Sequence, residues 1–284
     1  MLLEKTIAFI GAGSMAEAMI SGIIAAGKVP ANQIFVTNRT NRERLQQLEV
    51  EYKINGLPSQ DLKIENIDII VLAMKPKDAE GALQSIKDSL QPNQLVLSVL
   101  AGITTAYMER QLPAGQQVIR VMPNTSSMIG ESATAMSAGS YTTNENMLLA
   151  KELLETIGAV YEIPEDQMDV FTGVAGSGPA YIYYLMEHME ATVKKYGLQE
   201  KLSRDIIAQT IVGAAKMIQQ QGETPTTLRE NVTSPNGTTA AGLAALEKNG
   251  GGKAITQAIK HAATRSQEIS SQLESKTTQK VQAV

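Results

Sequence analysis

Short apolar runs alternate with longer segments of helical spacing in the first part of the chain. The runs are rich in Ile, Val and Leu and lie at Thr6–Ile10, Ile34–Thr37, Asp68–Met74, Leu95–Leu100 and Val118–Met122. Because they contain few alternating polar residues, they are typical of parallel strands that helices cover on both faces. The pattern therefore predicts an α/β domain with a Rossmann-type doubly wound sheet.

The rest of the sequence changes to a helical pattern. Ser132–Ala138 and Ala159–Ile163 are expected as further strands on either side of a helix at Glu145–Ile157, and Pro164 marks a break. Helices are then predicted at Pro179–Tyr196, Ser203–Gln221, Thr239–Lys248 and Lys253–Leu273, before a polar tail at 274–284 that is expected to fray. We expect a dinucleotide-binding domain over residues 1–164 and an all-α domain over residues 165–284.

Composition narrows the chemistry and the partners. The chain has no cysteine and only two histidines, which excludes disulfides and thiolate nucleophiles and argues against a metal centre or a hydrolytic triad. A net charge of −4 without a dense basic run predicts no nucleic-acid partner. No apolar stretch approaches the roughly 18 residues of a membrane helix, and no signal-peptide pattern is present. We expect a cytoplasmic protein without a metal ion.

A glycine-rich motif directly follows the first predicted strand. Residues 11–16 read GAGSMA, which fits G-x-G-x-x-G/A and leads into a predicted helix. We expect Gly11 to permit the sharp turn and Gly13 to let the backbone approach a pyrophosphate. The helix N-terminus, with Ser14 and Met15, would face that anion. Strand, motif and helix together favour a dinucleotide site over a simple glycine-rich turn.

The end of the second predicted strand indicates which dinucleotide binds. An NAD site usually has an acidic residue there, about 20 residues after the glycines, that binds the ribose hydroxyls. This chain has Asn38 and Arg39 instead, and a guanidinium can bind the 2′-phosphate of NADPH with two hydrogen bonds. NADPH is the expected cofactor, with NADH possible. In the alternative interpretation Arg39 merely begins the next helix.

Two further predicted strands end in proline-containing turns. The residues of interest are Ala73, Lys75 and Pro76 in the first turn and Met122, Pro123 and Asn124 in the second. Ligands of these folds bind outside the carboxyl ends of the strands, so we expect both turns to border the cofactor. The alternatives are that Lys75 is an exposed lysine without a role and that Asn124 is an ordinary turn residue.

Two signatures stand out in the helical half. Gly176–Tyr181 and Val232–Ala240 both combine Gly, Pro and Ser, and both are expected to open helices. Free N–H groups at a helix start, together with the helix dipole, can hold a carboxylate. Thr238 and Thr239 would add hydroxyl donors. The alternative is ordinary helix capping by Ser and Thr.

These motifs, taken in order, resemble those of the pyrroline-5-carboxylate reductases. The matching segments are Gly11–Ala16, Val71–Pro76, Met122–Ser126, Gly176–Tyr181 and Val232–Thr239, which span almost the whole chain. The resemblance implies NADPH-dependent reduction of 1-pyrroline-5-carboxylate to L-proline, the last step of proline biosynthesis. It places the nicotinamide near Met122, Pro123 and Asn124 and the cofactor ribose near Ala73, Lys75 and Pro76. It also implies a helical dimerisation domain that intertwines with its twin, in a dimer or a pentamer of dimers.

The resemblance also assigns the substrate site. It places the substrate carboxylate at Gly237, Thr238 and Thr239, with Ser234 nearby. Thr239, directly or through a water molecule, is the candidate catalytic residue because its hydroxyl would hydrogen-bond the ring nitrogen. The family usually has glycine where this chain has Asn236. Asparagine tolerates left-handed backbone angles, so we expect the turn to survive, with altered substrate affinity as a possible consequence.

Two other hypotheses remain at this point. The first is a β-hydroxyacid dehydrogenase, whose catalytic lysine in the first long helix of the helical domain would fall where this chain has Tyr181, Tyr183 and Tyr184. The second is a catalytically weak paralogue that binds the dinucleotide and acts through a partner, because a fold does not guarantee its chemistry.

Overall fold

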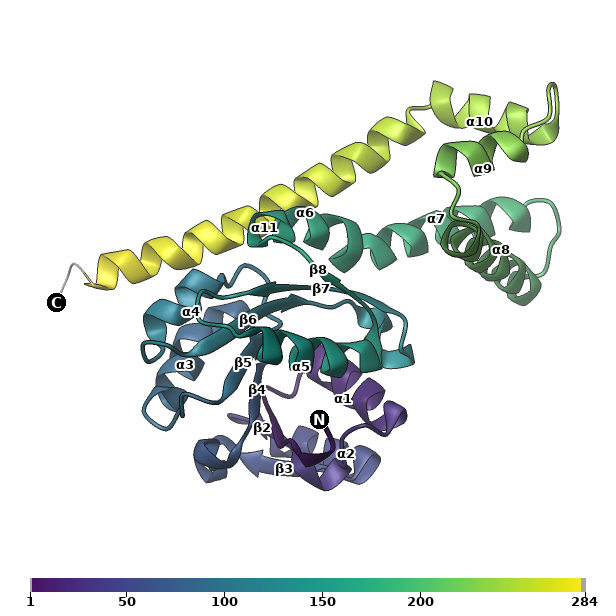
Figure 1. The fold of residues 1–284 in the computed structure, drawn as a ribbon. Coiled ribbons are helices and arrows are strands. Elements are labelled where there is room, and N and C mark those ends of the chain that lie inside the picture. The colour runs from purple at the N-terminus through teal and green to yellow at the C-terminus, as the bar shows by residue number, and fades with distance from the viewer. Residues whose placement is uncertain (1, 282–284) are drawn as a thin grey trace. The chain divides into compact units, whose positions relative to one another are not determined.

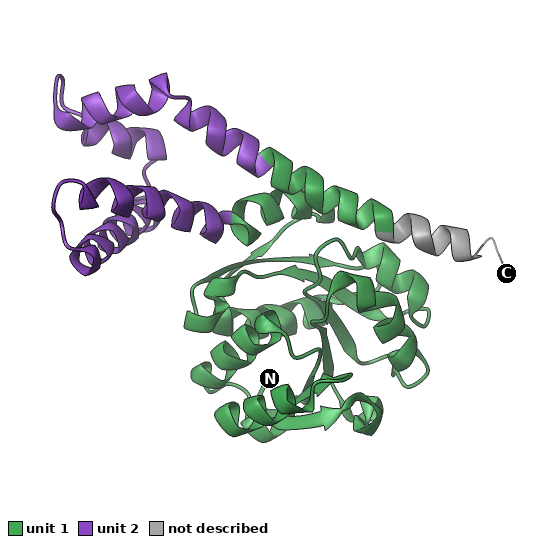
Figure 2. Cartoon of the chain, turned by 180° about the vertical axis from the view of Figure 1, so that it is seen from behind, with its two compact units in different colours: residues 1–177, 260–284 green, residues 178–259 purple. Residues whose placement is uncertain are grey.

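The chain forms two compact units, which Figure 2 shows in different colours. The computed structural model describes residues 2–281, with side chains described for residues 2–272. One unit comprises residues 1–177 together with 260–284, and the other comprises residues 178–259. The predicted boundary after residue 164 stays a prediction. No helix in the described part of the chain is both long and apolar enough to cross a lipid bilayer.

An eight-stranded sheet forms the centre of the first unit, in the order β3-β2-β1-β4-β5-β6-β7-β8 (Figure 1). The strands are β1 (Ile7–Ile10), β2 (Ile34–Asn38), β3 (Asn55–Pro58), β4 (Ile69–Leu72), β5 (Leu95–Ser98), β6 (Gln117–Met122), β7 (Ser132–Ala138) and β8 (Gly158–Glu162). The first six are parallel, as predicted for five of them, and β3 was not predicted; β7 pairs antiparallel with β6 and parallel with β8. The carboxyl ends of β2, β1 and β4 therefore lie next to one another.

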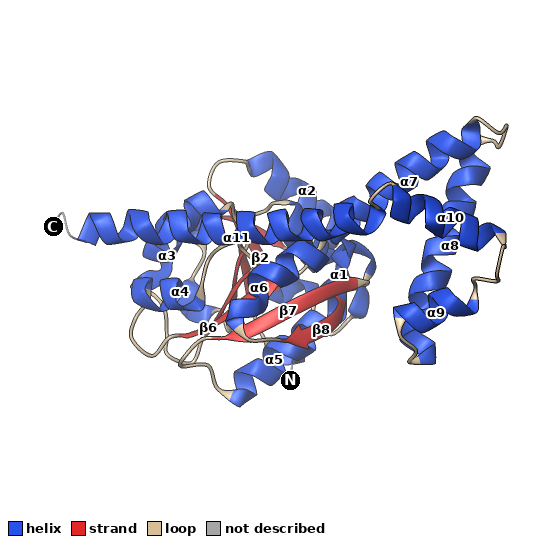
Figure 3. Cartoon of the chain, turned by 90° about the horizontal axis from the view of Figure 1, so that it is seen from above, coloured by secondary structure: helices blue, strands red, loops and turns tan. Residues whose placement is uncertain are grey.

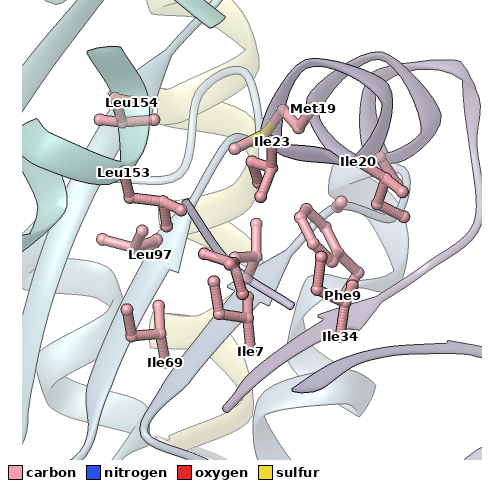
Figure 4. Packing of buried hydrophobic residues seen from close by; sticks show 14 of the residues in the cluster. Ile7, Phe9, Met19, Ile20, Ile23, Ile34, Ile69, Leu97, Leu153 and Leu154 are labelled. Carbon is pink, nitrogen blue, oxygen red and sulfur yellow. The ribbon is translucent and has the colours of Figure 1, made fainter. Parts of the chain in front are cut away.

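Helices cover both faces of this sheet, as Figure 3 shows from above. Phe9 and Ile69 belong to one buried face, which packs with α1 (Ser14–Ala26), α2 (Arg42–Tyr52) and α5 (Asn144–Leu154) (Figure 4). Ile70 and Val96 belong to the opposite face, which packs with α3 (Ala79–Lys87) and α4 (Thr105–Gln111). Because both faces are buried, the strands have continuous apolar sequences. The predicted doubly wound arrangement is confirmed.

A buried arginine joins three distant segments of this unit. Arg120 of β6 forms ion pairs of 3.4 Å with Glu165 and with Asp169 of α6 (Met168–Phe171). Asp169 also accepts a hydrogen bond of 2.6 Å from Ser266 on α11 (Gly251–Val281). The charge of Arg120 is thus compensated inside the protein, as a buried charge requires.

The tail that was expected to fray is helical as far as Val281, and its side chains lie outside the described part of the chain.

The second unit is all helical. It contains α7 (Gly178–Lys194), α8 (Glu200–Gln221), α9 (Pro225–Asn231), α10 (Thr238–Lys248) and the first part of α11. All except the short α9 were predicted. Arg204 of α8 donates two hydrogen bonds, of 2.8 and 3.1 Å, to the Glu190 carboxylate of α7. Within residues 178–259 only Ser203 and Ile207 are buried, so this unit has almost no core of its own.

Candidate dinucleotide and substrate sites

The turn between β1 and α1 forms the centre of the predicted cofactor site. Gly11 has a φ of +113°, which side chains of L residues rarely adopt. Its N–H donates to the carbonyl of Thr37 at 3.0 Å. A Cβ at Gly11 would lie 2.7 Å from the carbonyl carbon and oxygen of Ala73. Glycine is therefore required for the chain to pass between the ends of β2 and β4.

Gly13 has a different environment, because open space lies beside it. Its φ is −77°, and among the residues that the structure describes an added Cβ would meet only the Ala73 carbonyl oxygen, at 3.8 Å. Gly13 is the N-cap of α1 and supplies no side-chain cap. Ser14 is exposed in the first turn, and Met15 is half-buried. An uncapped helix N-terminus with free space outside it fits a pyrophosphate.

Helix α2 supports the glycine turn from the side of β2. The Arg44 Nε donates to the Ala12 carbonyl at 3.1 Å, and the same guanidinium forms an ion pair with Glu17 of α1. The sequence motif did not single out Arg44, because this contact depends on how α2 packs against the turn.

Asn38 ends β2 and Arg39 follows it, and the two residues have separate roles in the turn. The Asn38 Oδ1 accepts hydrogen bonds from the backbone N–H groups of Thr40 at 3.1 Å and Asn41 at 3.2 Å. The Arg39 side chain is 82% exposed, and its Nη2 lies 3.7 Å from Oδ1 of Asp78. Since α2 begins only at Arg42, with Asn41 as its cap, the interpretation that Arg39 begins this helix is wrong. Its guanidinium is accessible to a phosphate at the sheet edge.

The turn after β4 borders the glycine turn. Ala73 is buried, and its N–H donates to the Ile10 carbonyl at 2.9 Å. Lys75 is exposed at the N-cap of a short 3-10 turn that begins with Pro76. The structure thus brings Ala73 beside Gly11 and leaves the Lys75 ammonium accessible to an anion.

Met122, Pro123 and Asn124 at the end of β6 are all buried. The Asn124 side chain donates to the Ala175 carbonyl at 3.1 Å and accepts from the N–H of Ser126 at 3.0 Å. Its amide therefore links the turn after β6 to the segment after α6. These contacts give Asn124 a structural role, and its contact with a nicotinamide stays a prediction.

Gly176–Tyr181 contains the start of α7 at Gly178, as predicted, and a π-helical turn precedes this start. Thr172–Gly176 form a π-helical turn directly after α6, and the Ser177 N–H donates to the Thr172 carbonyl at 2.9 Å. Ser177 keeps helical backbone angles, with φ −89° and ψ −18°. Single π-helical turns are frequent at functional sites, and here one positions the carbonyl that Asn124 binds.

The second signature opens a helix, as predicted. Gly237 is the N-cap of α10 and supplies no side-chain cap, and its N–H donates to the Ser234 carbonyl at 3.0 Å. An added Cβ at Gly237 would lie 2.4 Å from the Ser234 hydroxyl oxygen. Ser234, Thr238 and Thr239 are all exposed. Hydroxyls at an uncapped helix start form a fitting site for a carboxylate.

Asn236 has a φ of +60°. This is the left-handed region in which asparagine is the best tolerated residue after glycine. The turn before α10 therefore survives the replacement of glycine, as expected from the sequence.

These features define a dinucleotide-binding oxidoreductase with a Rossmann-type domain and a helical domain. The chain is 61% identical over 271 residues to pyrroline-5-carboxylate reductase 1 of Bacillus subtilis strain 168, covering 95% of this chain and 91% of that protein. It is 35% identical to pyrroline-5-carboxylate reductase of Arabidopsis thaliana, covering 93% and 95% of the two chains. The chain belongs to the pyrroline-5-carboxylate reductase family, which excludes the β-hydroxyacid dehydrogenase hypothesis.

Family models and solved structures agree with this assignment. Residues 165–269 match the model described as pyrroline-5-carboxylate reductase dimerisation, and residues 6–102 match the one described as NADP oxidoreductase, coenzyme F420-dependent. The crystal structure of Plasmodium falciparum pyrroline carboxylate reductase with NADP bound is similar, with a TM-score of 0.87 and 27% identity, covering 95% of this chain and 100% of that one. The Coxiella burnetii enzyme has a TM-score of 0.83 and 31% identity, covering 94% and 98%.

Proposed function

We propose that this chain reduces 1-pyrroline-5-carboxylate to L-proline with NADPH, in the last step of proline biosynthesis. Membership of the family supports the reaction. The observation that carries the choice of cofactor is the end of β2, where the exposed Arg39 follows Asn38 and no acidic residue stands. An acidic residue there would repel a 2′-phosphate, whereas a guanidinium binds it. The cytoplasm remains the predicted compartment.

The proposed cofactor site is the carboxyl edge of the parallel strands. The pyrophosphate would be held at the α1 N-terminus and the 2′-phosphate at the end of β2, while the turns after β4 and β6 would contact the ribose and the nicotinamide. The residues are Gly11, Gly13, Ser14, Met15, Asn38, Arg39, Ala73, Lys75, Pro76, Met122, Pro123 and Asn124. When bound, the dihydronicotinamide supplies the hydride.

The proposed substrate site is the start of α10. The N–H groups of Thr238 and Thr239 and the hydroxyl of Ser234 would bind the substrate carboxylate, with Gly237 leaving room for that hydroxyl. The positive end of the helix dipole adds to this attraction. A substrate carboxylate held there fixes one end of the ring. Because the ring is rigid, this also orients the imine carbon that reacts.

The reaction needs little from the protein besides orientation. A protonated imine is already electrophilic at its carbon, so hydride adds to that carbon while the C=N electron pair moves to nitrogen. A strong general acid is therefore unnecessary, in keeping with a site that offers hydroxyls and N–H groups. We assign Thr239 the role of hydrogen-bonding the ring nitrogen, directly or through a water molecule, with its hydroxyl oxygen accepting from the N–H of the protonated imine.

The test of the proposed reaction is the loss of NADPH absorbance on adding 1-pyrroline-5-carboxylate, with proline identified in the product. Arg39→Gln is expected to raise the KM for NADPH about 10- to 100-fold, the range for losing a hydrogen bond to a charged group, with little effect on NADH. Arg265→Gln, an exposed arginine on α11, is the control. NADPH binding without turnover would instead support the dinucleotide-binding paralogue.

Thr239→Ala tests the assigned catalytic role. We expect kcat to fall about 10-fold, which corresponds to the loss of one hydrogen bond worth about 1.4 kcal/mol, while the Kd for NADPH stays unchanged. Thr239→Ser, which keeps the hydroxyl, should restore most of the rate. If kcat and the KM for the imine were both unchanged in Thr239→Ala, Thr239 would have no such role.

We further propose that the helical unit self-associates as a dimer, with a pentamer of dimers as the larger alternative. The unit contains a cavity of about 980 Å³ whose lining includes Tyr181, Tyr184, Leu243, Leu246 and Ile255. A second copy of this chain is the occupant that the dimerisation model favours. Because so little of the unit is buried in the single chain, pairing would supply the missing core.

A further inference from the structure

An acidic side chain lies beside the guanidinium that we assign to the 2′-phosphate. Asp78 is the last residue of the 3-10 turn after β4, and its Oδ1 is 3.7 Å from Nη2 of Arg39. In the sheet, β1 lies between β2 and β4. The two side chains therefore approach each other from either side of the glycine turn, along the edge where the cofactor is proposed to bind.

The orientation of Asp78 is unusual for its position in the chain. It is the N-cap of α3, where an aspartate normally accepts a hydrogen bond from the first turn of the helix. Here its φ of −97° and ψ of −1° are helical, and its side chain makes no cap hydrogen bond. The Asp78 carboxylate is 33% exposed and faces Arg39.

We infer that Asp78 competes with the cofactor 2′-phosphate for Arg39 and thereby reduces the preference for NADPH over NADH. The inference rests on the proposed binding of NADPH at Arg39. A 2′-phosphate that binds the Nη2 of Arg39 takes the place of the Asp78 carboxylate as the partner of that group. NADH carries a hydroxyl at that position and does not compete with Asp78.

The size of the effect follows from the exposure of the pair. Arg39 is largely in solvent, where ion pairs are weak, so we expect a change of about two- to fivefold in affinity. Because exposed charges are screened, the change should shrink as salt is raised from about 0.02 to 0.5 M.

The experiment is calorimetric binding of NADP⁺ and NAD⁺ to the full chain and to Asp78→Asn. We expect Asp78→Asn to bind NADP⁺ about two- to fivefold more tightly at low salt, with NAD⁺ affinity unchanged. Asp88→Asn removes the same charge from the exposed far end of α3 and should change neither affinity. In an Arg39→Gln background the effect of Asp78→Asn should disappear, because no guanidinium is left to compete for.

Three other outcomes would overturn the inference, and each shows which of its assumptions is wrong. Unchanged or weaker NADP⁺ binding in Asp78→Asn, with Arg39→Gln still losing NADP⁺ affinity, would refute the competition while leaving the proposed cofactor site intact. Tightening that persists in the Arg39→Gln background would show direct repulsion of the phosphate instead. If Arg39→Gln bound NADP⁺ as tightly as the unmodified chain, the proposed cofactor site and the inference would fail together.

Discussion

Two glycines of one motif meet different demands at the residue scale. Gly11 is surrounded by protein backbone and has a positive φ, whereas Gly13 has an ordinary φ and faces open space. The first glycine is required by the fold, and the second is required only if something outside the protein approaches it. Substitutions can therefore separate folding from binding.

Alanine substitutions at these two positions should have different effects on stability. In Gly11→Ala the added Cβ meets the Ala73 backbone at 2.7 Å, and we expect the free energy of unfolding to fall by about 1–3 kcal/mol, with NADPH binding lost. In Gly13→Ala we expect unchanged stability, but NADPH binding weakened at least about 10-fold, since the Cβ would occupy the pyrophosphate position. Urea unfolding and NADPH titration measure both quantities. Stability lost equally in both variants would contradict this division.

Single residues also show what the sequence can and cannot reveal. The left-handed conformation of Asn236 was predictable, because a glycine-rich turn demands it and asparagine tolerates it. The Arg39–Asp78 pair and the Arg120 ion pairs were not, because each joins residues that only the sheet topology brings together. Chemistry that depends on one contiguous motif was visible in the sequence, and chemistry that depends on strand order was not.

The same distinction holds at the scale of elements. Seven of the eight strands have apolar sequences and were predicted, but β3 was not. Its residues, Asn55–Pro58, include Asn, Gly and Pro, which disfavour strands, and none of them is fully buried. This edge strand forms through its pairing with β2. The antiparallel direction of β7 was also hidden, because apolar content does not encode direction.

The carboxylate of Asp68, directly before β4, makes the link to the residues directly before β1 dependent on pH. Burial raises the pKa of Asp68, but hydrogen bonds from the Thr6 backbone, from Lys5 and from the Thr6 hydroxyl outweigh it and hold the pKa below its usual value. A lowered pKa means that the ionised form stabilises the fold. This contribution is complete above the unfolded pKa of about 3.9 and is lost as the pH falls through the lower folded value.

Asp68→Asn should therefore lower the free energy of unfolding at pH 7 by about 1–2 kcal/mol, the range for hydrogen bonds to a charged group at a partly exposed site. The difference from the unmodified chain should be constant between about pH 5 and 8 and should shrink below about pH 4. Asp88→Asn, at an exposed position, serves as the control. Urea titrations at pH 7 and pH 3 provide the measurement, and an equal difference at both values would refute the role of ionisation.

At the scale of the whole molecule, the two units differ in how they are stabilised. The sheet unit has two extensive apolar clusters, one on each face. The helical unit buries only two of its residues and exposes Tyr184, Leu246 and other large apolar side chains. Helical spacing predicted all of its helices except α9, but it cannot tell whether an apolar face packs within the chain or against another copy.

Two leucines of equal exposure allow a test of self-association. Leu246 on α10 and Leu148 on α5 are each 61% exposed. Leu246 lines the cavity of the helical unit, whereas Leu148 lies on the surface of the sheet unit. A glutamate at position 246 would have to lose its hydration in a paired interface, which costs several kcal/mol for a buried charge without a partner. A glutamate at position 148 would remain in water.

We expect Leu246→Glu to reduce the mass measured by light scattering and to lower the melting temperature. If the assembly is a dimer, the mass should fall to that of a single chain. Leu148→Glu should leave both values unchanged. NADP⁺ affinity should be retained in both variants, because the residues proposed to bind it all lie in the sheet unit, which has its own core. If Leu246→Glu kept the mass of the unmodified protein, the α10 face would not belong to the interface. The exposed apolar surface of the helical unit would then need a different partner.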